Sequence, residues 1–313
     1  MNLQLGMLQD NGGPTLTMAP VPGSLLIDQG YSAGEAADQR GRPRTYDMPG
    51  VPSAALGDGT DIGAVEIGPL NLVVTNTLDT GAGSLRAAVQ VGDPGDLITF
   101  ASNVVGTLVL SNGPLAIQRD LMILGPGAGV LAISGNNNHD VIEVLSGIVG
   151  LSGLTITAGK ITGSPGGFEA NGGLARGGGV FNQSTLALNN CIISNCTAIG
   201  GTGGSTGSGF AGNGGNAQGG GILNIGTLSM TNCSIVASTA TGGAGGTATS
   251  GGSPGSGGQG YGGGLYSLGS LTLVRCSVTG NNAAGGTGGG GAGSGSGGGL
   301  ANRSTAASAS SIR

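Results

Sequence analysis

Residues 177–193 read GGGVFNQSTLALNNCII, and closely related phrases return at residues 219–235, GGGILNIGTLSMTNCSI, and at residues 262–278, GGGLYSLGSLTLVRCSV. Each phrase opens on a glycine triplet and ends on Leu-x-Leu-x-x-Cys-x-Ile or a close variant. The phrases lie 42 and then 43 residues apart. A fixed period of this length predicts a stacked array, in which each repeat is one unit that cannot bury its apolar face without a neighbour.

Apolar residues alternate within each phrase and are then interrupted by two residues. Leu186 and Leu188 form the first apolar pair, and Cys191 and Ile193 form the second. Alternation predicts strands with one buried face, and the two-residue break turns the chain so that the next strand faces the same core from another side. Residues 149–156 fit the same template with a leucine in the cysteine position. The sequence therefore predicts an all-β fold in which each repeat is one coil of a parallel β-helix.

Composition and charge limit the kinds of protein this chain can be. Of 313 residues, 73 are glycine, 8% are charged and 3% are aromatic. A strict Gly-x-y period is absent, which excludes collagen, and 37% hydrophobic residues exceed what a typical disordered chain contains. The net charge is −5 and Lys160 is the single lysine. We therefore expect no nucleic-acid partner, and the lack of an 18-residue apolar run predicts no transmembrane segment.

The four cysteines allow two interpretations. Cys191, Cys233 and Cys276 share one inward position of the repeat. There, cysteine acts as a small core hydrophobe that stacks on its copy in the next coil. The alternative is a disulfide, for which Cys196 is the best candidate partner. A zinc-type Cys-x-x-Cys spacing is absent, so we expect no metal site.

Glycine-rich spacers separate the phrases at residues 200–219, 242–264 and 285–299. They are too long to be turns, so they must leave the array on one side. Three alternatives are open: flexible loops inserted into the β-helix, an ordered layer of extended or polyproline-II segments, and loops that bind a ligand. The spacers contain no aspartate, which excludes the calcium-binding nonapeptide repeat.

Residues 1–68 form an irregular segment of Pro-, Asp- and Gly-rich turn strings. Four of them read DNGGPT at residues 10–15, IDQG at 27–30, DQRGRPR at 38–44 and DIGAVE at 61–66. These four strings and the order in which they follow one another resemble the closing module of bacterial choice-of-anchor Q domain surface proteins. In that family the module follows a β-helix. The resemblance thus implies that this segment closes a preceding, missing β-helix and that the chain is a piece of a longer protein.

Residues 69–104 combine a strand pattern, LVVTNT at 72–77, a short helix pattern, SLRAAV at 84–89, and a second strand at 96–100. This arrangement resembles the cap that begins repeat domains of the CSLREAI group. A cap is needed because a solenoid exposes its first core layer. The resemblances together imply a right-handed parallel β-helix of the pectin-lyase-like type at residues 105–313, placed outside the cell or on its surface.

Enzymes occur on parallel β-helices, so the acidic residues of the array are candidates for catalysis. A glycosidase needs two carboxyl groups roughly 5 to 10 Å apart. Asp120, Asp140 and Glu143, with His139 beside them, form the acid-bearing patch of the array, and the chain carries no acid after Glu169. The stretch around His139 is more simply a polar turn, so we expect no catalytic residue. The alternative is a polysaccharide lyase or glycosidase whose site is this patch.

The remaining motifs point to no cofactor and to no particular ligand. Phe181, Leu223 and Tyr266 occupy the same position after the glycine triplet, which indicates a structural role. The sequence singles out no binding residue. We therefore expect a non-catalytic, structural or adhesive segment of a cell-surface or secreted protein. Its expected partners are extracellular or cell-surface glycans or proteins. The alternative function is that of a polysaccharide-active enzyme or of a glycan-binding module.

Overall fold

The computed structural model describes residues 3–11, 13–21, 23–48, 51–68, 71–303 and 307–312. The chain divides into two compact units, one made of Met1–Leu72 with Gln90–Leu97 and the other of Val73–Val89 with Ile98–Arg313. Strands are the main regular secondary structure of the described residues, which contain a single α-helix, α1 (Leu85–Val91). Ser84 begins this helix as predicted, because its hydroxyl accepts a hydrogen bond from the Ala87 N–H at 3.1 Å.

The first unit contains little regular structure among its described residues. Isolated antiparallel bridges join Leu5 to Pro20, Gln9 to Thr17 and Ala37 to Pro43. Much of its order comes instead from buried carboxylates that accept hydrogen bonds from backbone N–H groups, as described below for Asp28, Asp61 and Glu66.

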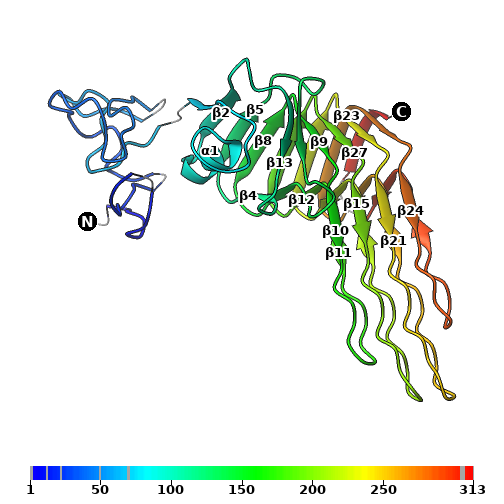
Figure 1. The fold of residues 1–313 in the computed structure, drawn as a ribbon. Coiled ribbons are helices and arrows are strands. Elements are labelled where there is room, and N and C mark those ends of the chain that lie inside the picture. Colours follow the sequence, from blue (N-terminus) through cyan, green and yellow to red (C-terminus); the bar gives the residue numbers. More distant parts are fainter. Residues whose placement is uncertain are drawn as a thin grey trace. The chain divides into compact units, whose positions relative to one another are not determined.

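In the second unit, successive repeats place equivalent strands side by side (Figure 1). The largest sheet has 13 strands, in the order β1 (Asn71–Val74), β2 (Asp96–Phe100), β5 (Leu121–Leu124), β8 (Ile148–Ser152), β13 (Thr185–Asn189), β18 (Thr227–Thr231), β23 (Ser270–Thr279), β19 (Ser234–Val236), β14 (Ile192–Ser194), β9 (Thr155–Thr157), β6 (Leu131–Ser134) and β3 (Gly106–Val109), with β27 (Ala307–Ile312) beside β23. The six-stranded sheet consists of β4 (Leu115–Ile117), β7 (Ile142–Val144), β12 (Val180–Asn182), β17 (Ile222–Asn224), β22 (Leu265–Ser267) and β26 (Leu300–Asn302).

Two further sheets of four strands each stand where the glycine-rich spacers leave and rejoin the repeats. One consists of β10 (Lys160–Thr162), β15 (Thr197–Ile199), β20 (Thr239–Thr241) and β24 (Asn282–Ala284). The other consists of β11 (Ala175–Arg176), β16 (Ala217–Gln218), β21 (Gly260–Tyr261) and β25 (Gly295–Ser296).

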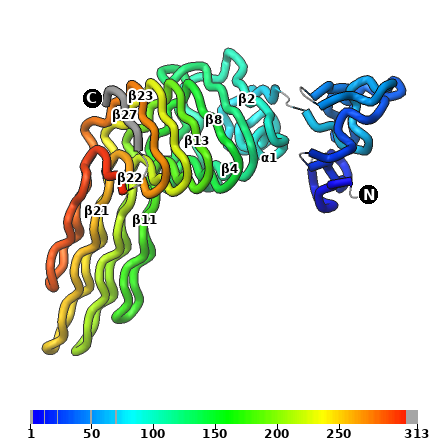
Figure 2. The backbone as a smooth tube through the Cα atoms, turned by 180° about the vertical axis from the view of Figure 1, so that it is seen from behind, coloured from blue at the N-terminus to red at the C-terminus, as the bar shows by residue number. Residues whose placement is uncertain are grey.

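The pairing between repeats is parallel and follows the sequence period. β13 pairs with β18 so that Leu186 lies beside Leu228, and β18 pairs with β23 so that Leu228 lies beside Leu271. These leucines are buried, as are the cysteines that follow them, so the apolar positions of the repeated phrase line one core. The predicted all-β class and the predicted parallel pairing are therefore confirmed, and Figure 2 shows the repeats lying one against the next.

A ladder of buried amides runs beside this apolar core. Asn182 donates from Nδ2 to Asn224 Oδ1 at 2.7 Å, and Asn224 donates from Nδ2 to the Ser267 hydroxyl at 2.9 Å. Each amide also donates to a backbone carbonyl of the next repeat, that of Thr227 or Ser270. The polar groups are thus satisfied, which is the condition for burying them.

The two-residue break of each phrase is a corner with left-handed backbone. Asn190, Asn232 and Arg275 have φ angles of 51°, 53° and 52°. Asparagine tolerates this conformation better than arginine does. The sequence predicts an amide ladder here that Arg275 breaks. That prediction is wrong in its second half, because Arg275 donates from Nε to Asn232 Oδ1 at 2.9 Å and continues the ladder that Asn232 makes to Asn190.

Arg275→Asn should stabilise the second unit, because it places a residue suited to φ near +52° at a corner where arginine is strained. The expected gain is about 1 kcal/mol in the free energy of unfolding, the lower end of the cost of holding such a residue in this conformation. Chemical denaturation measures it, and Arg176→Asn, a change at an exposed arginine without a left-handed backbone, is the matched control. An unchanged or lowered midpoint for Arg275→Asn would contradict the expectation.

The glycine triplets that open the repeated phrases have two different physical causes. Gly219, the first glycine of its triplet, has a φ of 67°, which side chains disfavour. Gly220, the second, is so closely surrounded by backbone that a Cβ would stand 2.3 Å from the carbonyl oxygens of Thr239, in its own repeat, and of Gly263, in the next repeat. The first glycine provides a turn and the second allows the chains to approach each other.

The spacers form an ordered structure, which we name the glycine-rich extension (residues 163–174, 200–216, 242–259 and 285–294). Each spacer runs out from the repeats as an outgoing arm and comes back as a returning arm (Figures 1 and 2). Backbone hydrogen bonds connect the arms at every third residue. Gly200, Gly203 and Thr206 donate to the next outgoing arm, at 2.9, 2.8 and 2.9 Å, whereas Gly201 and Gly204 donate to the preceding returning arm, both at 2.8 Å.

A period of three is that of the polyproline-II helix, which gives each arm three faces. One face bonds to the neighbouring arm of the same layer, one bonds to the opposite layer, and one is left for side chains. Near the repeats the two layers enclose the small side chains of Ala175, Ala198, Ala217 and Ala240. Of the alternatives for the spacers, the structure therefore corresponds to the ordered layer, not to the flexible loops expected as insertions.

Candidate functional site

The structure brings together only part of the acidic patch that the sequence proposes as an alternative catalytic site. Asp140 and Glu143 interact, and Asp140 is 5% exposed. Asp120 has a different role, because its carboxylate accepts a hydrogen bond from the Ile148 N–H at 2.7 Å. The ring nitrogens of His139 contact the carbonyl oxygens of Asp140, at 2.6 Å, and Leu110, at 3.2 Å. Asp120 thus serves a backbone group, and His139 contacts backbone carbonyls and also interacts electrostatically with Asp140.

Asp140 and Glu143 form a carboxyl pair with an unusual proton affinity. Burial, and to a smaller extent the negative charge of Glu143 and a hydrogen bond with it, raise the pKa of Asp140 to about 7. The pair therefore holds a proton close to neutral pH. Among the described residues, no group of three His, Cys, Asp or Glu side chains is placed to hold a metal ion.

The cysteines have the packing role that the first interpretation predicts. All four are free and buried, so the disulfide alternative is wrong. The Cys233 sulfur lies 3.4 Å from the Cys191 backbone nitrogen, one repeat away. Burial raises the pKa of Cys196 to about 12, so this side chain is a neutral thiol at physiological pH.

The acids of the turn strings in the first unit are also structural. Glu66 accepts the N–H groups of Asp61, at 2.9 Å, and Tyr46, at 3.0 Å. Asp61 in turn accepts the Asp28 N–H at 2.8 Å, and the Asp28 carboxylate accepts the Met48 N–H. Burial raises the pKa of Glu66 to about 7. These carboxylates hold together a unit whose described residues make little strand pairing.

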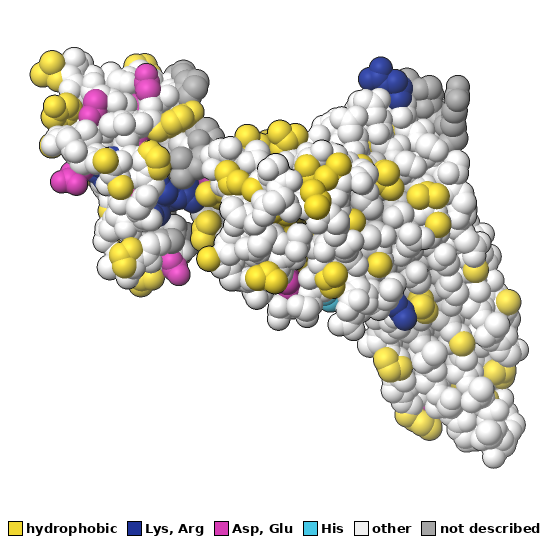
Figure 3. All heavy atoms as spheres, turned by 45° about the horizontal axis from the view of Figure 1, so that its top comes forward, with side chains coloured by type: hydrophobic (Ala, Val, Ile, Leu, Met, Phe, Trp, Pro, Cys, Tyr) yellow, Lys and Arg dark blue, Asp and Glu magenta, His cyan; other side chains and the backbone are white. Residues whose placement is uncertain are grey.

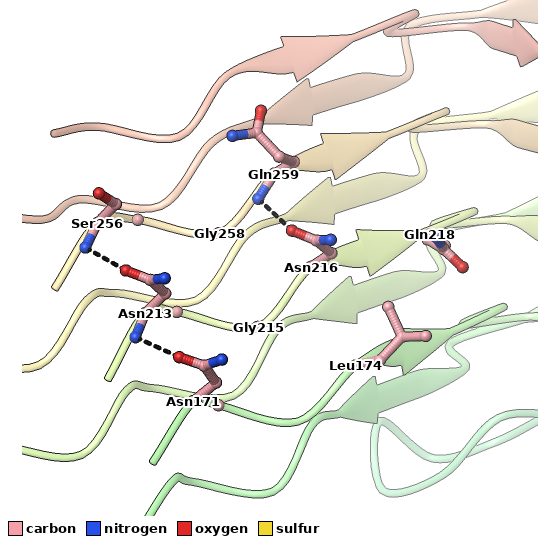
Figure 4. A pocket seen from close by; sticks show the side chains of 12 residues that line it. Asn171, Leu174, Asn213, Gly215, Asn216, Gln218, Ser256, Gly258 and Gln259 are labelled. Atoms are coloured by element: carbon pink, nitrogen blue, oxygen red, sulfur yellow. Dashed lines mark hydrogen bonds between the residues drawn. The ribbon is translucent and has the colours of Figure 1, made fainter. Parts of the chain in front are cut away.

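A groove of about 500 Å³ lies on the returning arms of the glycine-rich extension. We name it the amide groove, because carboxamides dominate the side chains that line it (Figure 4). Leu174, 38% exposed, contributes an apolar surface, and glycine backbone forms the rest. Its polar side chains are those of Asn171, Asn213, Asn216, Gln218, Ser256 and Gln259.

Hydrogen bonds to the backbone hold these carboxamides in place. Asn171 Oδ1 accepts the Asn213 N–H, Asn213 Oδ1 accepts the Ser256 N–H, and Asn216 Oδ1 accepts the Gln259 N–H, each at 2.8 Å. Gln259 Oε1 accepts the Ser294 N–H at the same distance. Every acceptor lies one repeat before its donor, so the amides form two ladders across the arms. With the oxygen fixed, the amide nitrogen of each side chain is fixed as well.

The ladders use the amide oxygens of these side chains and not their amide nitrogens. Within the part of the chain that the structure describes, those of Asn171, Asn213, Asn216 and Gln259 donate to no protein acceptor. The side chains that line the groove carry no charge. Figure 3 shows few charged side chains on the visible face of the extension. The groove is therefore a neutral surface that offers fixed N–H donors.

Phe210 extends the same face toward the tip of the extension. It precedes Asn213 by three residues on the returning arm, pairs with Ser253 of the next arm and is 80% exposed. In a helix with three residues per turn, residues 210, 213 and 216 point in the same direction. An exposed aromatic ring thus stands on the face that carries the amides.

Sequence reasoning missed the amide groove, although a signal for it exists. The returning arms carry NGGL at residues 171–174, NGGN at 213–216 and SGGQ at 256–259, at the same spacing as the repeated phrases. Polar residues recurring every third position beside paired glycines indicate one exposed face of a polyproline-II arm. Without knowledge that the arms are ordered, this pattern is indistinguishable from a polar, glycine-rich loop.

Sequence comparisons with known proteins assign no family to this chain. Neither a protein-family model nor a curated protein matches the sequence. The described residues include no helix with the length and apolar character required to cross a membrane.

Proposed function

We propose that the chain is a non-catalytic, adhesive segment of a bacterial cell-surface or secreted protein, built as a right-handed parallel β-helix of the pectin-lyase-like type. In this proposal the stacked repeats are a scaffold, and the function is carried by the glycine-rich extension that they display. The observation that supports it best is the regular backbone hydrogen bonding within the extension, whose arms are bonded to each other at every third residue.

The turn strings of residues 1–68 support a surface location, since they resemble the closing module of choice-of-anchor Q surface proteins. The burial of Asp140 and its contact with Glu143 favour a function without catalysis. Asp140 is buried and hydrogen-bonds with Glu143. Glycosidase carboxyl groups instead stand about 5 Å or more apart, with the sugar between them.

Two measurements test the proposal together. Antibodies raised against the glycine-rich extension should label intact cells of the source organism, or its culture medium. The purified chain should release no product from a panel of polyuronates and neutral polysaccharides. Cleavage that Asp140→Asn abolishes would instead establish the lyase or glycosidase alternative, and labelling only after the cells are permeabilised would exclude surface display.

A further inference from the structure

We propose that the amide groove binds a neutral glycan chain, which deepens the proposed adhesive function and rests on it. The proposal concerns the four carboxamides of Asn171, Asn213, Asn216 and Gln259 and the exposed ring of Phe210. The ligand is a polysaccharide whose hydroxyl groups accept hydrogen bonds from the amide nitrogens.

Preorganisation of the donors is the first argument. A free asparagine side chain on a surface loses rotamer freedom when it binds, and this cost weakens binding. Here the cost is met during folding, because backbone N–H groups at 2.8 Å hold the amide oxygens. A ligand therefore meets donors that are already ordered.

The spacing of the donors is the second argument. Asn213 and Asn216 stand three residues apart on one arm, which corresponds to about 9 Å along a polyproline-II segment. Asn171 and Asn213 stand on adjacent arms, about 4.8 Å apart. The donors thus form a two-dimensional grid over several repeats. Such a grid suits an extended polymer with regularly placed hydroxyls better than a single small molecule.

The chemistry of the lining selects a neutral ligand. A binding site for an acidic glycan needs cations to compensate its charge, and the groove lining has none. Carboxamides match hydroxyl groups, since both kinds of group donate and accept hydrogen bonds. Leu174 and Phe210 provide apolar surfaces, 38% and 80% exposed, for the C–H faces of sugar rings.

Asn213→Asp and Asn216→Asp test the role of the donors directly. Aspartate keeps the oxygen that accepts the N–H of the next repeat, so the ladder persists, but it replaces the outward amide donor by an acceptor. Asn232→Asp is the control for the added negative charge, because it introduces the same carboxylate at a corner of the repeats outside the groove, where Arg275 contacts the retained oxygen. Hydrogen exchange at Ser256 and Gln259 checks that both ladders remain intact.

Binding of the full chain is measured by affinity electrophoresis against dextran, mannan and a soluble β-glucan, with polygalacturonate and heparin as acidic probes. The unmodified chain should bind at least one neutral polysaccharide. Asn213→Asp and Asn216→Asp should each weaken that binding about tenfold, the effect of one lost hydrogen bond, and Asn232→Asp should leave it unchanged. Phe210→Ala should weaken it by a similar factor through lost stacking.

Failure to bind any neutral polysaccharide, binding to the acidic probes alone, or equal binding by the groove variants and the unmodified chain would each overturn the inference. These outcomes leave the proposed adhesive function in place, because surface labelling and the absence of glycan cleavage are measured separately. Loss of those two properties would instead overturn the proposed function itself.

Discussion

Gly215→Ala is expected to force neighbouring returning arms of the glycine-rich extension apart. A Cβ at this position would stand 1.9 Å from the Gly173 carbonyl oxygen. The Gly215 N–H also donates to the Gly201 carbonyl at 2.7 Å, and its own carbonyl accepts the Gly243 N–H at 2.8 Å. The methyl group has no space unless the preceding returning arm moves away, which strains the bonds to the two outgoing arms. We expect a cost of about 3 kcal/mol, the upper range for overpacking, together with local loss of order.

Gly207→Ala is the matched control for that variant. Gly207 lies in the same spacer and is exposed, and a Cβ added to it would meet no other atom within 4 Å. Hydrogen exchange followed by mass spectrometry distinguishes the two. Gly215→Ala should lose protection at Gly201 and Gly243 while the β13–β18 ladder stays protected, and Gly207→Ala should match the unmodified chain. Equal protection in both variants would contradict the layered packing of the extension.

The stability of the second unit is expected to fall as the pH rises toward neutral, because of Asp140. The folded chain keeps the Asp140 proton up to about pH 7, whereas an unfolded chain releases it near the ordinary value of 3.8. Between these limits the folded state binds more protons, so the free energy of unfolding decreases with pH. The full change corresponds to about 4 kcal/mol.

Asp140→Asn should remove that pH dependence, since asparagine does not titrate. The measurement is the free energy of unfolding at several pH values from about 4 to about 8, compared between the variant and the unmodified chain. Asp120→Asn is the control, because the Asp120 carboxylate faces a backbone N–H rather than a second acid. The same slope in all three proteins would show that Asp140 is not the group responsible.

Sequence reasoning predicted the parts of this protein that local chemistry controls. Leu186, Leu188, Cys191 and Ile193 are buried where alternation places them, because a strand with one buried face has a period of two whatever surrounds it. The corner at Asn190 was predictable for a similar reason, since two residues that break the alternation must turn the chain. The helix start at Ser84 follows from a capping preference that is local as well.

The candidate site was not predictable in the same way. Asp140 interacts with Glu143 and electrostatically with His139. The Asp120 carboxylate and the His139 ring nitrogens contact backbone groups that the packing of adjacent repeats supplies. The amide groove was missed because its donors are fixed by N–H groups 42 or 43 residues later in the chain. No local sequence pattern specifies which arms will become neighbours in the folded chain.

The sequence by itself determined the repeat, its period and the residues that face its core, because periodic apolar side chains must be buried together. Only the tertiary structure decided what the glycine spacers become. Glycine allows a chain more conformations than any other residue does. A glycine-rich segment is therefore ordered only where neighbouring segments bond to it. Here the stacked repeats bring the arms close enough for their backbones to bond, and that proximity creates the extension and its amide groove.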